Sequence, residues 1–131
     1  MTSRLDLIGI VVDDMAATVA FYRRLGLEFA EGAESEGHVE VMLAGGLRLA
    51  WDTAEVIRSF DPEWMPPKGS SPFALAFLVD SPAEVDALHG QLVAAGAPSH
   101  LEPFDAFWGQ RYASVRDPDG YGVDIFAPLP G

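Results

Sequence analysis

The sequence contains no cysteine and few basic residues. Without cysteine the chain has no disulfide bond, no thiolate metal site and no cysteine nucleophile. Its 8 lysines and arginines stand against 20 acidic residues, which gives a formal net charge of −12 without any basic run. Nucleic acid is therefore not an expected partner, because phosphate binding needs clustered lysine and arginine. An acidic surface favours solubility and attracts cationic small molecules.

Long apolar runs and nucleophile motifs are also missing. The first apolar run, LIGIVV at 7–12, is too short for a signal-peptide core or a membrane span, so we expect a soluble cytoplasmic protein without a membrane partner. The chain has no G-x-S-x-G sequence, and its GG pair at 45–46 is typical of a hairpin turn rather than a phosphate loop. What is present is 131 residues, 49% of them hydrophobic, which suits one packed domain.

An internal repeat predicts two similar halves. The segments IGIVVDDMAATVAFYRRLG and LAFLVDSPAEVDALHGQLVAAG share the order apolar strand, capping residue, amphipathic helix and glycine. In the first helix Met15, Val19 and Tyr22 form the apolar face. In the second, Ser81 is the N-cap and Glu84 completes a capping box. Each half is therefore interpreted as a short α+β module.

The strand pattern gives each module the order β-α-β-β-β. The first module is expected to have its later strands at 27–33, 38–44 and 47–53, the last two joined by the GG turn. The proline-rich segment 53–72 is interpreted as a linker with one short helical turn, and DPDG at 117–120 as a hairpin turn. We expect a single domain over 1–131, with module one at about 4–52 and module two at about 73–128.

With FYRRLGLEF in the first half and WGQRYASVRDPDGYGVDIF in the second, the sequence resembles the vicinal oxygen chelate superfamily. This superfamily includes glyoxalase I, extradiol dioxygenases and bleomycin-resistance proteins. The resemblance implies two β-α-β-β-β modules whose strands form a curled mixed sheet, or cup, with helices outside, and it implies a homodimer. In metal-dependent members, a histidine on the first strand and a glutamate on the last strand of each module bind a divalent metal.

Carried over to this sequence, those four metal positions are Leu7, Ala50, Ala74 and Asp124. Three of them have no ligand atom, and a divalent metal site needs three or more ligands. We therefore expect no metal and no cofactor. His38 and Glu40 share a strand face, so a site made of His38, Glu40 and Asp124 remains an alternative.

The remaining polar and aromatic residues predict a binding cavity. Arg48 and Asp52 alternate with Ala50 and so share its face, where an Arg48–Asp52 or Arg48–Asp124 ion pair is the plain interpretation. Aromatic walls with a few charged groups suit a planar or cationic organic molecule. The candidate ligand-binding residues are Arg48, Trp51, Asp52, Trp64, Phe104, Phe107, Trp108, Tyr112, Ser114 and Asp124.

The function we expect is metal-independent binding of a small organic molecule, as in bleomycin-resistance proteins that sequester an antibiotic. The first alternative is a metal-dependent lyase, isomerase or dioxygenase with the unusual ligands above. The second is a metal-free acid–base enzyme that uses Asp124. A third is a regulatory protein with a vestigial cup. The aromatic loop EPFDAFWGQRY either lines the pocket or packs on its own domain or a partner subunit, and His89 and His100 are expected to face solvent.

Overall fold

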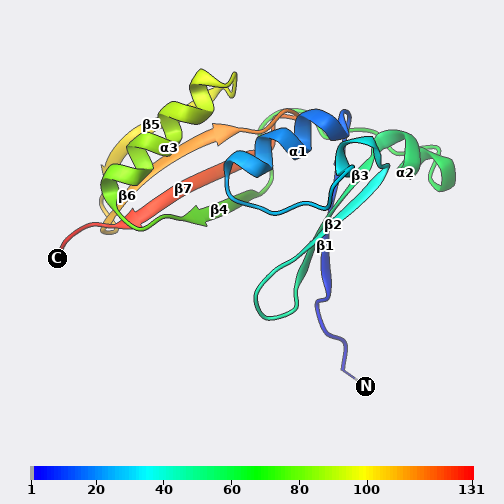
Figure 1. Cartoon of the computed structure of the whole chain (residues 1–131), viewed down its shortest axis with the longest axis horizontal. Coiled ribbons are helices and arrows are strands. Elements are labelled where there is room, and N and C mark those ends of the chain that lie inside the picture. The colour runs from blue at the N-terminus through cyan, green and yellow to red at the C-terminus, as the bar shows by residue number, and fades with distance from the viewer. Residues whose placement is uncertain (1) are drawn as a thin grey trace. The chain divides into compact units, whose positions relative to one another are not determined.

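The computed structural model of the chain describes residues 2–131. The chain divides into two compact units, Met1–Pro67 and Lys68–Gly131. Each unit contains one mixed sheet and at least one α-helix, so the expected α+β class is confirmed (Figure 1). Across the described part of the chain, every helix is too short or too polar to cross a membrane.

The first unit holds a three-stranded sheet in the order β1-β3-β2. Its elements are β1 (Leu7–Val12), α1 (Met15–Arg24), the 3₁₀ helix η1 (Ala33–Ser35), β2 (His38–Met42), β3 (Arg48–Thr53) and α2 (Ala54–Phe60). Strand β1 runs parallel to β3, and β2 runs antiparallel to it through the turn at 45–46. Both glycines of that turn have positive φ, 88° and 91°, as the hairpin interpretation requires.

Helix α1 packs on one face of this sheet, as its sequence pattern predicts. Asp14 caps it, since the Asp14 Oδ1 accepts a 3.1 Å hydrogen bond from the Ala17 amide. Met15, Val19 and Tyr22 are all buried. The Tyr22 ring lies 5.2 Å from the ring of Trp51 on β3, and Trp51 is 0% exposed. The core of the first unit is therefore built around Trp51.

The strand expected at 27–33 is absent, so that prediction was wrong. Residues 27–30 have no regular secondary structure, and a turn at Gly32, with φ of 83°, leads into η1. The segment contributes to the core instead, because the Phe29 ring packs 5.3 Å from Trp51. The first unit is thus β-α-β-β. The linker also differs, since residues 54–60 form the whole helix α2, which Thr53 caps through a 3.2 Å bond from the Val56 amide.

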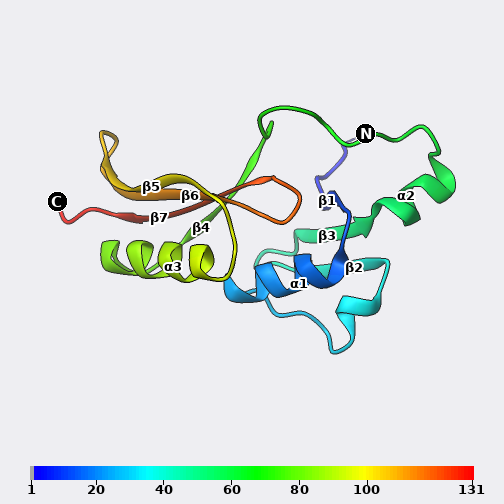
Figure 2. The ribbon, with the colours of Figure 1, turned by 90° about the horizontal axis from the view of Figure 1, so that it is seen from above.

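The second unit has the expected order β-α-β-β-β. Its elements are β4 (Ala74–Leu78), α3 (Pro82–Ala94), β5 (Ser99–Ala106), β6 (Gln110–Arg116) and β7 (Gly122–Pro128). They form a sheet in the order β4-β7-β6-β5, with β4 parallel to β7 and the other pairs antiparallel. Helix α3 runs along one face of this sheet (Figure 2).

Local signals in the second unit were predicted correctly. The Glu84 amide donates to the Ser81 Oγ at 3.3 Å, and the Glu84 carboxylate accepts from the Asp80 amide at 2.9 Å. The turn at 117–120 closes with a 2.9 Å bond from the Gly120 amide to the Asp117 carbonyl. The start of α3 and the turn before β7 therefore form as the local sequence predicts.

Two expectations for the second unit were wrong. His89 does not face solvent: it is 5% exposed, because its spacing from Val85 and Leu92 places it on the buried stripe of α3. Its Nε2 lies 2.8 Å from the Ser99 Oγ. The aromatic segment around 102–112 is not a loop but the β5–β6 hairpin, with a turn at 107–109. His100, in contrast, is exposed as expected.

Replacing Trp51 should therefore damage the core, whereas replacing Trp108 on the hairpin turn should not. Trp51→Ala is expected to lower the free energy of unfolding by about 3–5 kcal/mol, since it empties a fully buried aromatic site. Trp108→Ala, at a side chain that is 48% exposed, should cost less than about 1 kcal/mol. Urea unfolding followed by circular dichroism measures both. Equal losses for the two variants would contradict this assignment of the core.

Candidate functional site

Each sheet has one face under its helix and one face that no helix of the same unit covers, which we call the open face. Side chains of strand partners in register point to the same side, and successive residues alternate. The open face of the first sheet carries Leu7, Gly9, Val11, His38, Glu40, Met42, Arg48, Ala50 and Asp52. The open face of the second sheet carries Ala74, Ala76, Leu78, Phe104, Gln110, Tyr112, Ser114, Arg116, Asp124 and Phe126.

A chain of hydrogen-bonded charges crosses the open face of the first sheet. His38 lies between two carboxylates, with its Nδ1 2.5 Å from Asp52 and its Nε2 2.7 Å from Glu40. Arg48 donates to the other oxygen of Glu40 at 2.7 Å and to Asp6 at 2.6 Å. Arg48 and Asp52 share the face, as predicted, but they do not pair with each other. Asp52 is bonded to His38 on β2, and Arg48 is bonded to Glu40 on β2 and to Asp6 just before β1.

These contacts shift the pKa of each group so that its charged form is favoured. The hydrogen bond to Glu40, and then that to Asp52, raises the pKa of His38 above its ordinary 6.5. The same bond from His38, followed by that from Arg48, lowers the pKa of Glu40. Arg48 likewise lowers the pKa of Asp6. Positive and negative side chains therefore alternate along these hydrogen bonds. They pair with one another and not with an incoming ligand.

The open face of the second sheet is organised around Asp124. The Tyr112 hydroxyl, one strand away on β6, donates to the Asp124 Oδ2. Ser114 lies directly opposite Asp124 in the β6–β7 register and is buried. Burial, and then the hydrogen bond to Asp124, raises the pKa of Tyr112 to about 12. Tyr112 is therefore a neutral hydrogen-bond donor throughout the physiological range.

Three further aromatic rings cluster with that of Tyr112. The Trp108 ring lies 5.3 Å from Tyr112, Phe104 lies 6.1 Å from Tyr112, and Phe107 lies 5.0 Å from Trp108, all close to edge-to-face. The Trp108 Nε1 donates to the Gln110 Oε1 at 2.7 Å, which fixes the indole. Phe107 is 96% exposed. The edge-to-face packing leaves ring faces of this aromatic cluster available to a ligand.

The other candidate residues lie elsewhere. Trp51 is on the helix-covered face of the first sheet, within the core. Trp64 follows α2 and packs against Arg58, whose guanidinium carbon is 5.2 Å from the ring centre. Sequence reasoning missed Phe126, which is half-buried on the open face directly opposite Tyr112. Its spacing of two residues from Asp124 was the signal that could have found it.

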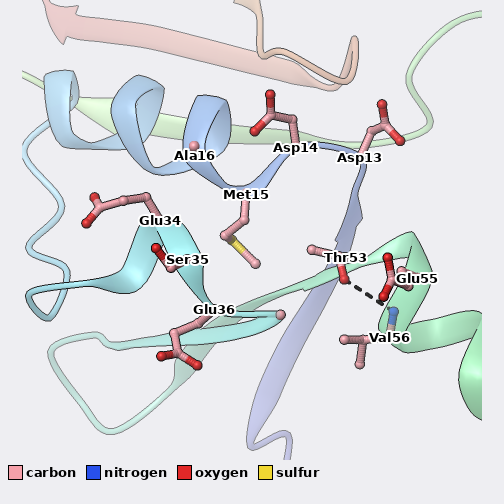
Figure 3. Close-up of a pocket in the computed structure, with 11 residues that line it drawn as sticks. Asp13, Asp14, Met15, Ala16, Glu34, Ser35, Glu36, Thr53, Glu55 and Val56 are labelled. Carbon is pink, nitrogen blue, oxygen red and sulfur yellow. Dashed lines mark hydrogen bonds between the residues drawn. The ribbon is translucent and has the colours of Figure 1, made fainter.

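The first unit also contains an open hollow with an acidic rim, of about 590 Å³ (Figure 3). The start of α1, the 34–37 segment and the start of α2 surround it. Several of its polar groups already have structural partners. Asp14 caps α1, Thr53 caps α2, and Glu34 pairs with Arg23 at 2.8 Å. None of the candidate residues from the sequence lines this hollow.

The family follows from the sequence and the fold together. The family model described as "Glyoxalase/Bleomycin resistance protein/Dioxygenase superfamily" matches residues 4–125. The chain belongs to this superfamily. No curated protein matches the sequence.

Solved structures of the superfamily have the same fold. The chain is similar to a glyoxalase/bleomycin resistance protein/dioxygenase family enzyme from Burkholderia phytofirmans PsJN, with 23% identity and a TM-score of 0.80 over 97% of this chain and 100% of the other. It is also similar to a glyoxalase/bleomycin resistance protein/dioxygenase from Nocardioides, with 26% identity and a TM-score of 0.73 over 100% and 88%. A glyoxalase-related enzyme from Fulvimarina pelagi has 23% sequence identity and a TM-score of 0.78, over 96% of this chain and 88% of the other.

The residues at the superfamily's metal positions do not fit a divalent ion. Leu7 and Ala50 lie on the open face of the first sheet, and Ala74 and Asp124 on that of the second. Of these side chains, Asp124 alone carries ligand atoms. Among residues 2–131, no three His, Asp or Glu side chains are grouped to hold a metal ion. His38 and Glu40, the alternative ligands, are hydrogen-bonded to each other within the charged chain.

The charged chain of the first sheet should be visible as a raised histidine pKa. We expect the His38 imidazole to titrate above 6.5, and Glu40→Gln to return its pKa toward that value. Because the folded-state pKa is raised, the stabilisation is present in full below pH of about 6.5 and is lost as pH rises through the raised value. NMR titration of the ring carbons, with Glu102→Gln as a carboxylate control, tests this. A titration midpoint of His38 at or below pH 6.5 in the unsubstituted protein would contradict this chain of hydrogen-bonded charges.

Proposed function

We propose that this protein binds a small planar organic cation, without a metal, on the open face of its second sheet. The observation that carries the proposal is the juxtaposition of the Asp124 carboxylate and the aromatic cluster of Phe104, Phe107, Trp108 and Tyr112. A binding role of this kind fits the bleomycin-resistance branch of the superfamily, so sequestration of an antibiotic-like compound is the biological role we propose. With it goes the proposal of a cytoplasmic homodimer.

Electrostatics favour a cation at this face. Asp124 is half-buried, and its nearest hydrogen-bonding partner is a neutral phenol rather than a base. Among residues 2–131, no basic side chain forms an ion pair with Asp124, so a cationic group on a ligand gains by pairing with it. The net charge of −12 adds a long-range attraction for cations.

The aromatic cluster supplies the surface for a flat ring system. Trp108 and Phe104 stand at right angles to each other, with ring centres 6.2 Å apart, and both are partly exposed. Exposed aromatic faces gain from stacking and from cation–π contact. The exposed Leu78 and the small Ala74 and Ala76 on β4 extend the same face with apolar surface. These features suit a flat ligand.

The acid–base alternative finds less support. A proton-transfer enzyme needs groups whose pKa values lie near the working pH. The pKa of Tyr112, about 12, is far above that range, and its hydroxyl is committed to the carboxylate that would act as base. Binding therefore accounts for the arrangement of Tyr112 and Asp124 better than catalysis.

Binding can be tested with two matched probes, 2-naphthylmethylammonium and the neutral 2-naphthylmethanol. We expect isothermal titration calorimetry to show that the cation binds about tenfold more tightly, since one ion pair of this kind contributes roughly 1.4 kcal/mol. Asp124→Asn should remove that preference. Trp108→Ala should weaken both probes alike, because it removes stacking surface.

The matched control is Asp105→Asn, which removes the same charge from the same sheet. Asp105 is in register with Arg111 and bonded to it, and Arg111 keeps its partner Asp86 when Asp105 is replaced. This variant should bind both probes as the unsubstituted protein does. The proposal fails if neither probe binds, or if Asp124→Asn and Asp105→Asn reduce cation binding equally.

A further inference from the structure

We propose that Tyr112 determines which kind of cation the open face of the second sheet accepts. By occupying one oxygen of Asp124, it makes the site selective for a protonated amine over a forked cation such as an amidinium or guanidinium. This inference rests on the proposed function and names the ligand class more narrowly. The inference and the proposed function make different predictions for matched cations, so one experiment can distinguish them.

The Asp124 carboxylate has two oxygens in unlike situations. Oδ2 accepts the Tyr112 hydroxyl. Oδ1 accepts no hydrogen bond from a side chain or backbone group of residues 2–131. The β6–β7 register makes the two oxygens unlike. Ser114 is directly opposite Asp124, and Tyr112 is two residues before Ser114 on the same strand. Tyr112 thus approaches Asp124 diagonally and reaches one oxygen.

Tyr112 cannot easily leave this position. Its ring is packed between Trp108, at 5.3 Å, and Phe104, at 6.1 Å, and Trp108 is itself held by Gln110. Its hydroxyl is part-buried, so breaking the bond to Asp124 would leave a partly desolvated donor without a partner. The pKa of about 12 also keeps the hydroxyl protonated, so Oδ2 stays occupied at physiological pH.

The chemistry of cations then separates two classes. An ammonium group is a compact charge that needs one acceptor oxygen, so it can bind at Oδ1 while Tyr112 stays in place. An amidinium or guanidinium gains most of its affinity from two parallel N–H bonds to both oxygens of a carboxylate. At Asp124 that geometry competes with the Tyr112 hydroxyl. A quaternary ammonium has no N–H donor and loses the hydrogen bond at Oδ1 altogether.

The test measures the affinities of three cations that share one ring: 2-naphthylmethylammonium, 2-naphthamidinium and 2-naphthylmethyl-trimethylammonium. In the unsubstituted protein, calorimetry should give the primary ammonium an affinity about tenfold above those of the other two. Tyr112→Phe keeps the ring but frees Oδ2, so the amidinium should gain about tenfold and overtake or equal the ammonium. The trimethylammonium should not gain, because it cannot use the freed oxygen.

Tyr121→Phe is the matched control. It removes a phenol from the same unit, where the Tyr121 ring packs 5.5 Å from Phe73 rather than beside Asp124. It should leave the order of the three affinities unchanged. Thermal unfolding of both variants verifies that they are folded, and the order measured in the unsubstituted protein stands as a test even if Tyr112→Phe does not fold.

The possible outcomes distinguish a failure of this inference from a failure of the proposed function. Cations that bind through Asp124 with no preference for the ammonium, or a preference that Tyr112→Phe leaves unchanged, would overturn the role of Tyr112 and leave the proposed function standing. Binding that Asp124→Asn does not weaken, or no binding of any probe, would overturn both. The inference is supported if the unsubstituted protein prefers the ammonium and Tyr112→Phe raises the affinity of the amidinium but not that of the trimethylammonium.

Discussion

The two-residue alternation along β7 is the constraint on which the candidate site depends. Val123, Ile125 and Ala127 are fully buried on the face that α3 covers. The residues between them must therefore point to the opposite face, and these are Asp124 and Phe126. A one-residue slip would bury the carboxylate against α3 and expose the core, at a cost of several kcal/mol. The hydrophobic core thus fixes the position of the only charged side chain on this stretch of strand.

The two open faces use charge in different ways. On the first sheet, His38 and Arg48 neutralise the neighbouring carboxylates, so the face is internally satisfied. On the second, Asp124 has a neutral partner and adjoins exposed aromatic rings. The open face of the first sheet is thus ion-paired, whereas the Asp124 carboxylate on the second sheet is bonded to a neutral phenol.

Features that depend on neighbouring residues in sequence were predictable. The caps at Asp14 and Ser81 and the turn at 117–120 need a few residues each, and the apolar stripe of α1 needs one helix. Features that depend on partners distant in sequence were not. Residues 27–33 pair with neither edge strand of the first sheet, and Phe29 packs against Trp51 instead. The ring nitrogen of His89, on the buried stripe of α3, has its partner Ser99 on another element. The face shared by Arg48 and Asp52 was predicted correctly, but their partners were not, since Arg48 is bonded to Asp6, which is 42 residues away, and Asp52 to His38 on another strand.

Locating a bound cation on the protein tests the proposed binding face most directly. In a ¹H–¹⁵N NMR titration with 2-naphthylmethylammonium, we predict that the largest amide shifts occur in β6 and β7, at and beside Tyr112, Ser114 and Asp124. The indole N–H of Trp108 should shift with them, whereas that of Trp51 should not. Shifts centred on the first sheet or on the hollow at the start of α1, with Asp124 and Trp108 unmoved, would contradict the account.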